Sequence, residues 1–437
     1  MPSIAIIGSG IAGLGSAWFL RHEHEVTVFE ADDRIGGHAH TVLVPEDGRQ
    51  VPVDTGFMVF NHVTYPNLLR LFRALDVPIK PTDMSFSVRH GPQALEYRGT
   101  SLNTLFAQRR NLLRPSFYRF LLQIDRFNRE AVAALDDPAV AGLTLADYVA
   151  ARGYGDAFLN LYLVPMSSAV WSTPPDEMLR FPAATLLRFF HNHGFLGLHT
   201  QHPWWTIDGG SRRYVERLTA GFRERIRTRC PVQRVRRTDR GIELATPDGT
   251  ACFERVVFAC HAPTALALLG AGATPGERRV LSAFRYQPNT ALLHTDAAVM
   301  PRRRLAWSAW NYRIEAAPGA GAPIQASTHY WMNRLQGVSE RRDYFVSING
   351  EALVDPAQVI RRIACEHPLF DLAARRAQAD LPALNETASL RTATYFAGAW
   401  QRYGFHEDGL VSALAACRAI LRRDPWASPR SLELSVA

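Results

Sequence analysis

The chain has 437 residues, a length typical of two or three domains. Hydrophobic residues make up 47% of it and charged residues 21%, the composition of an ordinary globular protein with little room for long disorder. The formal net charge is +8, although Lys80 is the single lysine. The arginine clusters are short, as at Arg302, Arg303 and Arg304, and match no nucleic-acid-binding motif, so we expect no nucleic-acid partner.

The apolar segments and the cysteines indicate whether the protein spans a membrane, is secreted or binds a metal. No apolar run reaches about 18 residues, and the N-terminus enters a strand pattern directly, so neither a membrane-spanning helix nor a signal peptide is expected. We therefore predict a cytoplasmic protein whose only membrane contact is peripheral, at the inner face of the membrane. The five cysteines are scattered and form no C-x-x-C pair, which argues against a metal site or a redox disulfide.

The first thirty residues predict a strand, a glycine turn, a helix and a second strand. Ser3–Ile7 is an apolar run followed by three glycines with the spacing G-x-G-x-x-G and a helix-forming stretch. In this motif the first glycine allows a tight turn, the second lets backbone approach a pyrophosphate, and the third lets the helix pack on the strand. The second strand, Glu25–Phe29, leads to a carboxylate suited to ribose hydroxyls. The predicted dinucleotide-binding residues are Gly8, Gly10, Ile11, Ala12, Gly13, Glu30 and Ala31.

The segment after Glu30 distinguishes flavin from nicotinamide cofactors. Residues 31–37 carry an arginine and a second glycine pair, and His38 follows directly. The segment resembles the extension shared by flavin-containing amine oxidases, carotenoid desaturases and protoporphyrinogen oxidases. This resemblance implies that the cofactor is FAD. It also implies that Arg34, Gly36, Gly37 and His38 support the pyrophosphate and lead the chain toward the isoalloxazine ring.

Two internal segments fit the same superfamily. Gly209 and Gly210 resemble the glycine pair with which the chain re-enters the FAD domain, although Ser211 could equally cap an ordinary helix. Residues 232–235, a turn at Asp248 and Gly249, and a strand at 255–259 resemble the β-meander that follows. The resemblance implies that backbone groups of Val232 meet the adenine, while a valine in a strand is more often a core residue.

A third segment lies near the C-terminus. Residues 395–400 predict a short strand ending in a glycine, followed by residues 404–410 and a helix from Val411. The segment resembles the closing flavin motif of the superfamily. The resemblance implies that Gly398 approaches the pyrophosphate and ribitol, and that Gly409 and Leu410 lie at a helix N-terminus facing the flavin, where negative charge is favoured.

Together these segments predict an α/β fold, α+β overall, of the amine-oxidase kind. A Rossmann-like FAD-binding domain with a β-meander would comprise residues 1–85, 205–280 and 386–437, and an inserted mixed substrate domain would comprise residues 86–204 and 281–385. A helix is expected over residues 116–135. Aromatic residues of the inserted domain are candidates for an apolar substrate cavity, although aromatic side chains are also ordinary core residues. These candidates are Trp307, Trp310, Tyr312 and Tyr330.

Residues 286–296, 307–312 and 404–410 resemble a bacterial branch of the superfamily, the predicted FAD-binding oxidoreductases associated with modified fatty-acid metabolism. The resemblance implies a dehydrogenase or desaturase that removes hydride from a hydrophobic, lipid or fatty-acyl substrate. Amine oxidases usually keep a lysine near flavin N5, whereas Lys80 lies in a proline-flanked loop outside the substrate segments. The missing lysine therefore argues against the second possible function, a peroxide-forming amine oxidase. The third possible function is that of a non-redox mutase or isomerase.

Two histidines are candidates for proton transfer. His406 lies in the closing motif, where relatives place a side chain against the flavin, and an ordinary histidine pKa near ~6.5 suits acid–base catalysis at neutral pH. Packing or hydrogen bonding to the cofactor explains His406 equally well. His38, next to the second glycine pair, is the other candidate.

Overall fold

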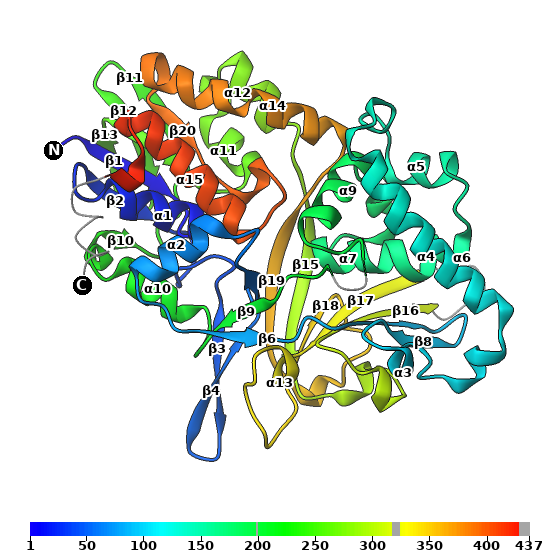
Figure 1. The fold of residues 1–437 in the computed structure, drawn as a ribbon. Coiled ribbons are helices and arrows are strands. Elements are labelled where there is room, and N and C mark those ends of the chain that lie inside the picture. The colour runs from blue at the N-terminus through cyan, green and yellow to red at the C-terminus, as the bar shows by residue number, and fades with distance from the viewer. Residues whose placement is uncertain (198–199, 317–323, 428–437) are drawn as a thin grey trace.

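The computed structural model describes residues 1–197, 200–316 and 324–427. Five parallel strands form the first sheet, in the order β10-β2-β1-β14-β20. Its strands come from the start, middle and end of the chain (Figure 1). Their bounds are Ile226–Arg227 for β10, Glu25–Phe29 for β2, Ser3–Ile7 for β1, Arg255–Phe258 for β14 and Thr394–Phe396 for β20.

Both faces of this sheet are buried, as expected for parallel strands with continuous apolar sequences. Ile4 and Ile6 of β1 pack in the cluster that contains α1 and α15, whereas Ala5 and Ile7 pack in a second cluster with α11, α12 and α14. The sheet is therefore the middle layer of three. The helices run Ile11–Leu20 for α1, His406–Leu421 for α15, Ala262–Leu269 for α11, Pro275–Leu281 for α12 and Leu372–Thr387 for α14.

A three-stranded antiparallel meander is attached to this layer. It consists of β11 (Arg234–Thr238), β12 (Gly241–Thr246) and β13 (Gly249–Phe253), with the predicted turn between β12 and β13. The first strand begins at Arg234 and not at the predicted residue 232. Val232 lies in the segment before it, half-buried against the second apolar cluster.

A seven-stranded sheet forms the other large layer, in the order β19-β15-β18-β17-β16-β7-β8. Neighbouring strands are antiparallel except β16 and β7. The bounds are Val359–Leu369 for β19, Arg285–His294 for β15, Phe345–Ile348 for β18, Ile324–Trp331 for β17, Trp310–Ala316 for β16, Phe86–His90 for β7 and Leu95–Arg98 for β8.

A group of helices lies beside this sheet (Figure 1). Helix α4, Pro115–Ala133, agrees with the helix predicted over residues 116–135. The others are α3 (Leu102–Leu105), α5 (Leu145–Ala151), α6 (Asp156–Phe158), α7 (Val164–Trp171), α8 (Pro175–Met178) and α9 (Ala183–Asn192). The short helix α13 (Met332–Leu335) lies apart from this group, directly after β17 (Figure 1). The predicted division of the chain into an FAD-binding domain and a substrate domain stays a prediction.

Two small sheets connect the large ones. The hairpin of β3 (Thr41–Glu46) and β4 (Arg49–Asp54) is one, and β5 (Phe60–Asn61), β9 (Trp204–Ile207) and β6 (Ile79–Thr82) form the other. Helices α2 (Pro66–Ala74) and α10 (Arg212–Thr219) flank them. Lys80 therefore lies in a strand, and the prediction of a loop is wrong. Strand β6 is an edge strand, where Pro81 costs no ladder hydrogen bond. None of the helices described is long and apolar enough to cross a bilayer.

Candidate functional site

The glycine turn after β1 has the geometry that its spacing predicts. Gly8 has a φ of +105°, and a Cβ on Gly13 would lie 1.9 Å from the Gly8 carbonyl oxygen, so neither position accommodates a side chain. Gly10 is the N-cap of α1 and makes no side-chain cap, and a Cβ placed on it meets nothing within 4 Å. Ile11 and Ala12 form the first turn. The space next to Gly10 at this helix end is therefore open, and an anionic group there would be favoured by the free N–H groups of the first turn.

Glu30 lies beside this turn at the end of β2. The backbone N–H of Ser9 donates to Glu30 Oε2 at 2.9 Å, and that of Asp32 donates to Oε1 at 3.0 Å. The backbone of Glu30 is fixed as well, because its N–H donates to the Arg227 carbonyl at 2.8 Å. Ala31 follows with an exposed side chain. The carboxylate is thus held next to the turn, where ribose hydroxyls of a dinucleotide would reach it.

The second glycine pair folds back onto the first turn. The N–H of Gly36 donates to the Ser9 carbonyl at 2.9 Å, and Arg34 Nη1 donates to the Gly37 carbonyl at 2.8 Å. Gly36 and Gly37 have φ values of +109° and +57°, and a Cβ on Gly37 would lie 3.0 Å from Gly10 Cα. The two glycine-rich segments, separated in sequence, therefore form one backbone cradle.

The closing motif completes the cradle from the other end of the chain. Helix α15 begins at His406, earlier than the predicted start at Val411, and Gly409 lies inside its first turn. A Cβ on Gly409 would lie 2.7 Å from Ile11 Cγ2, so this glycine lets α15 cross α1 near both N-termini. Gly398 is tied to α15 because its N–H donates to Ser412 Oγ at 2.7 Å. Leu410 is fully buried, so only its backbone can face a ligand.

Three side chains near the cradle, those of His38, His367 and Cys260, combine accessible surface with strongly shifted pKa values, and we call the space that they face the hollow. His38 keeps an exposed surface, yet protein surrounds it so closely that burial, followed by the charges of His261 and Arg34, lowers its imidazole pKa to about 4. His367 and Cys260 are both half-buried, and burial disfavours the charged form of each side chain. It lowers the pKa of His367 to about 3 and raises that of the Cys260 thiol to about 12. We infer that the hollow is screened from bulk solvent. A cofactor whose pyrophosphate lay at the cradle would extend toward these side chains.

The imidazoles of His38 and His367 lie next to each other, with ring centroids 5.2 Å apart. Asn289 Nδ2 donates to His367 Nδ1 at 2.7 Å, and Asn289 Oδ1 is occupied as the acceptor of a 2.6 Å hydrogen bond from Asn349. His367 Nδ1 is therefore an acceptor, and the proton of the neutral ring is on Nε2. At neutral pH the hollow is lined here by uncharged rings, one of which presents an N–H donor.

His406 occupies a different environment from the one expected. Its ring stacks on Phe57 with centroids 3.8 Å apart, and its Nε2 is 3.2 Å from the hydroxyl of Tyr214. Burial, followed by the charge of His38, lowers its pKa to about 3. The expectation of an ordinary pKa near neutrality is therefore wrong, because the surroundings of the ring are apolar. The geometry favours the packing alternative, and a catalytic role for His406 stays a prediction.

The buried histidines predict acid lability. The pKa of His406 is about 3 in the folded chain and near 6.5 when unfolded, so below pH 6.5 only the unfolded chain takes up the proton. We expect the free energy of unfolding to be level above about pH 6.5 and to fall below it by about 1.4 kcal/mol per pH unit for each such histidine. Urea unfolding at pH 7.5, 6.5 and 5.5 measures this slope. His406→Phe should reduce this slope by about 1.4 kcal/mol per pH unit, the contribution of one histidine. An unchanged slope would contradict the low pKa of His406.

The four aromatic candidates lie on two different faces of the seven-stranded sheet. Trp310 and Tyr330 meet edge to face at 4.9 Å and join the apolar cluster of α1 and α15. Tyr312 packs with Trp310 and α7. Trp307 packs instead with Trp331 and Phe345 in the cluster on the opposite face. Trp307 therefore lies apart from the other three residues, and a place for any of the four in a substrate cavity stays a prediction.

One residue that organises the site was not recognised in the sequence. Asp54, at the end of β4, is fully buried, and burial raises its pKa. It accepts hydrogen bonds from Thr41 Oγ1 at 2.5 Å, Ser211 N at 2.9 Å and Gln336 Nε2 at 2.7 Å. This carboxylate joins the hairpin to the start of α10 and to the segment after α13. Gly210, just before Ser211, allows this close packing, because a Cβ at this position would lie 2.7 Å from Thr41.

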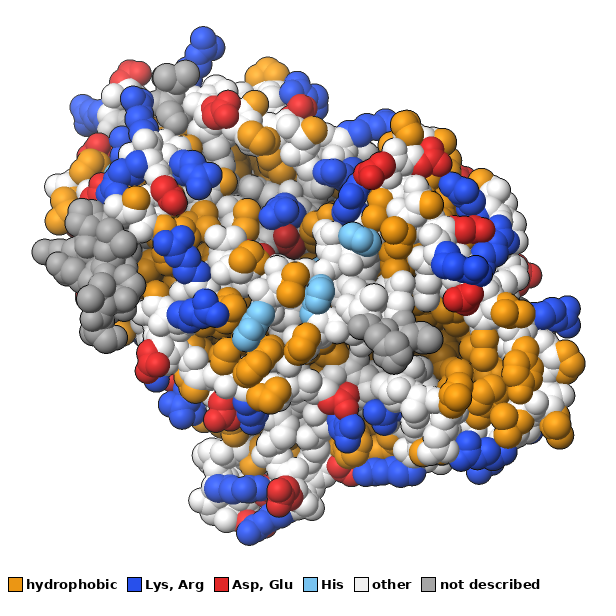
Figure 2. Space-filling model, in the orientation of Figure 1, with side chains coloured by type: hydrophobic (Ala, Val, Ile, Leu, Met, Phe, Trp, Pro, Cys, Tyr) orange, Lys and Arg blue, Asp and Glu red, His pale blue; other side chains and the backbone are white. Residues whose placement is uncertain are grey.

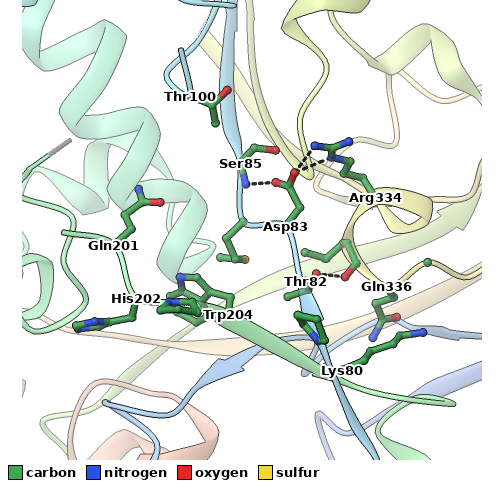
Figure 3. A pocket seen from close by; sticks show the side chains of 15 residues that line it. Lys80, Thr82, Asp83, Ser85, Thr100, Gln201, His202, Trp204, Arg334 and Gln336 are labelled. Atoms are coloured by element: carbon green, nitrogen blue, oxygen red, sulfur yellow. Dashed lines mark hydrogen bonds and ion pairs between the residues drawn. The ribbon is translucent and has the colours of Figure 1, made fainter. Parts of the chain in front are cut away.

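A surface pocket of about 710 Å³ opens beside β6 (Figure 3). Figure 3 shows Asp83 between Ser85 and Arg334, which donate to its carboxylate at 2.6 Å each. Lys80 lies at its edge and forms a 2.9 Å ion pair with Asp208. Among the residues described, the lining of this pocket contains none of the cradle glycines. Gln336, which lines the pocket, separates it from Asp54. The pocket thus lies apart from the cradle, and Lys80 is engaged by Asp208 at the edge of the pocket.

The three-layer fold and the double glycine cradle define a dinucleotide-binding flavoprotein, and the residues present fit FAD. Comparison with known proteins identifies the family. Residues 11–311 match the model of the flavin containing amine oxidoreductase family. The match covers more than half of the chain, and the chain belongs to this family, whose members are oxidoreductases that bind FAD.

Individual relatives are more distant. The chain is 27% identical over 259 residues to AofH of Mycobacterium tuberculosis, named as a flavin-containing monoamine oxidase; the match covers 57% of the chain and 54% of AofH. It is 26% identical over 387 residues to carotenoid phi-ring synthase of Streptomyces griseus, covering 83% and 65%. The fold resembles putrescine oxidase, with a TM-score of 0.66, 15% identity and coverage of 97% and 99%. It resembles a fatty acid isomerase from P. acnes equally, with a TM-score of 0.66, 16% identity and coverage of 96% and 98%.

Proposed function

We propose that this protein is an FAD-dependent dehydrogenase or desaturase that removes hydride from a hydrophobic, lipid or fatty-acyl substrate. The observation that carries the proposal is the character of the hollow. Its described walls include neutral imidazoles at His38 and His367. The aromatic pair Trp310 and Tyr330 belongs to the apolar cluster that also contains Ile11 and Leu410 of the cradle. The single lysine is held elsewhere by Asp208. Such walls favour an uncharged, apolar chain.

In this proposal each part of the cradle has a separate task. Bound FAD supplies the hydride-accepting chemistry. Gly8, Gly10 and Gly13, with Ile11 and Ala12, bring the N-terminus of α1 against the pyrophosphate, and Glu30 receives the ribose. Arg34 holds the second glycine pair in place through the Gly37 carbonyl. The N-terminus of α15 would face the bound cofactor, and its free N–H groups would stabilise negative charge there.

The residues around the hollow position the substrate and exclude water. Trp310 is half-buried and presents a flat apolar surface, and Tyr330 packs against it edge to face. His367 offers its Nε2–H as a hydrogen-bond donor, held in that tautomer by Asn289. His38 lies next to it and remains neutral, so it can accept a proton only transiently. Glu366, also on β19, is engaged by His261 at 3.2 Å.

Two observations support alternatives. The similarity to AofH supports an amine oxidase that releases peroxide, and an amine would enter as a cation or lose its proton first. The fold shared with a fatty acid isomerase supports a non-redox isomerase that also accepts an acyl chain. The relative named carotenoid phi-ring synthase supports an apolar substrate in general, because a carotenoid is a hydrocarbon-like molecule.

The expected result is that fatty-acyl substrates bleach the flavin absorbance near ~450 nm under anaerobic conditions, while putrescine and cyclohexylamine do not. Trp310→Ala should lower kcat/KM for the acyl substrate by about tenfold or more, the usual effect of losing one large apolar contact, and should leave the FAD content unchanged. The matched control is Trp307→Ala on the opposite face of the sheet, which should behave as the wild type.

The same assay separates the alternatives. Peroxide formed with an amine would establish the oxidase instead. Turnover of an acyl substrate only after prior reduction of the flavin, with no net electron transfer, would establish the isomerase. Equal effects of Trp310→Ala and Trp307→Ala would remove the aromatic pair from the substrate site. Lipid analysis of cells with and without the intact protein identifies the acyl chain that changes.

A further inference from the structure

An exposed apolar patch lies far from the cradle, on the edge of the helical region. Figure 2 shows hydrophobic side chains gathered at the lower right, over α3 and the start of α4 in Figure 1, with basic side chains around them. Leu113 is 88% exposed and Leu102 76% exposed, which is unusual for leucine. We call this surface the leucine patch; its members are Leu102, Leu112, Leu113, Tyr118, Leu122 and Leu305.

The leucine patch stands on a rigid support. Beneath it, Phe106, Phe117 and Phe120 are buried in a compact cluster of their own. The Tyr118 hydroxyl donates to the Leu112 carbonyl at 3.0 Å, which ties the turn Arg109–Leu113 to α4. The outward leucines therefore add little to the core. Their exposure is a property of the folded segment, and the core below them is already closed.

The charge around the leucine patch is positive and uncompensated. Residues 99–124 contain four arginines and no acidic residue. Arg109 and Arg110 donate to backbone carbonyls, those of Phe106 and Ala94 among them. In the described parts of the chain, none of the four forms an ion pair with a carboxylate. Three further arginines at 302–304 precede Leu305 in the turn that adjoins α3.

We propose that the leucine patch docks the protein onto an anionic lipid surface. Leucines that protrude between arginines match the two layers of such a surface, because the apolar side chains enter the acyl boundary while the guanidinium groups meet the headgroup phosphates. The absence of acidic residues from 99–124 favours a negatively charged partner over a second copy of this basic chain. The docking does not depend on the proposed substrate, and either proposal can fail alone.

The test is flotation of the full-length holoprotein with vesicles. We expect binding to vesicles of phosphatidylethanolamine with phosphatidylglycerol, weakening as salt is raised, and little binding to phosphatidylcholine. Leu112→Ser with Leu113→Ser should lower partitioning by about tenfold or more. Arg109→Gln with Arg110→Gln should lower it by about fivefold for each charge at low salt. Flavin content and circular dichroism establish that each variant is folded.

Matched controls change the same residue types elsewhere. Leu43→Ser on the β3–β4 hairpin, and Arg223→Gln with Arg225→Gln in the FAD-binding layer, should bind vesicles as the wild type does. Absence of vesicle binding, or equal losses in patch and control variants, would overturn the proposal. A concentration-dependent dimer that Leu112→Ser with Leu113→Ser abolishes, without vesicle binding in the wild type, would show instead that a second copy covers the patch.

Discussion

Gly10→Val is expected to give a folded protein that carries no FAD. The backbone of Gly10 has φ −70° and ψ −178°, which valine adopts readily, and a Cβ there meets no protein atom within 4 Å. The fold therefore tolerates the side chain. The added methyl groups project into the space that the N-terminus of α1 leaves for the pyrophosphate, so retention of the cofactor should be lost. Absorbance near ~450 nm and FAD released on heating measure the occupancy.

Gly142→Val is the matched control, because Gly142 is exposed and a Cβ on it also meets nothing within 4 Å. That variant should retain FAD as the wild type does. A yellow Gly10→Val protein with full FAD content would show that the cofactor lies in a different register on α1. An unfolded Gly10→Val protein would show that the turn is needed for folding itself, against the free space seen at this position.

His406→Ala should lower stability and FAD content while the remaining holoprotein works at nearly the wild-type rate. The alanine removes a buried ring that stacks on Phe57, and the loss of a buried aromatic of this size costs about 3 kcal/mol or more of unfolding free energy. The rate should change little, because a ring with a pKa of about 3 does not titrate near neutral pH. Anaerobic stopped-flow rates per bound flavin from about pH 6 to 9 measure the effect.

His406→Phe is the informative companion, because it preserves stacking on Phe57 while removing the imidazole. It should restore most of the stability and keep the rate per flavin. A loss of about 100-fold per flavin in both variants, with a changed pH profile, would instead establish the acid–base role predicted from the closing motif.

The parts of the site predicted from sequence are those that depend on local backbone geometry. Gly8 and Gly36 have φ values that other residues rarely adopt. The spacing of the glycines in the sequence predicts tight turns at both positions without knowledge of the rest of the fold. The sequence places the start of α15 too late, at Val411, because a glycine such as Gly409 is typical of a helix boundary. Its actual requirement is the crossing with Ile11, which is a tertiary contact.

The parts that sequence could not supply depend on distant contacts. Asp54 is 157 residues from Ser211 and 282 residues from Gln336, and no local pattern pairs them. The pKa of His406 is set by burial, which only the packed structure decides. The face on which Trp307 lies depends on the turn at 304–306 before β16, so alternation along the strand gives no guide to it.

The place of β20 and α15 also determines when the protein can mature during synthesis. β20 adds to the five-stranded sheet beside β14, and α15 packs across α1, so the cradle is complete only when both ends of the chain are present. The ribosome must therefore have released residues up to Leu421 before the N-terminal glycine turn gains its second wall. Until then the edge of β14 that pairs with β20 has no partner strand, and an unpaired strand edge of this kind favours aggregation. We therefore expect a chain that ends before α15 to lack one wall of the cradle and to retain FAD poorly, even with its first four hundred residues intact.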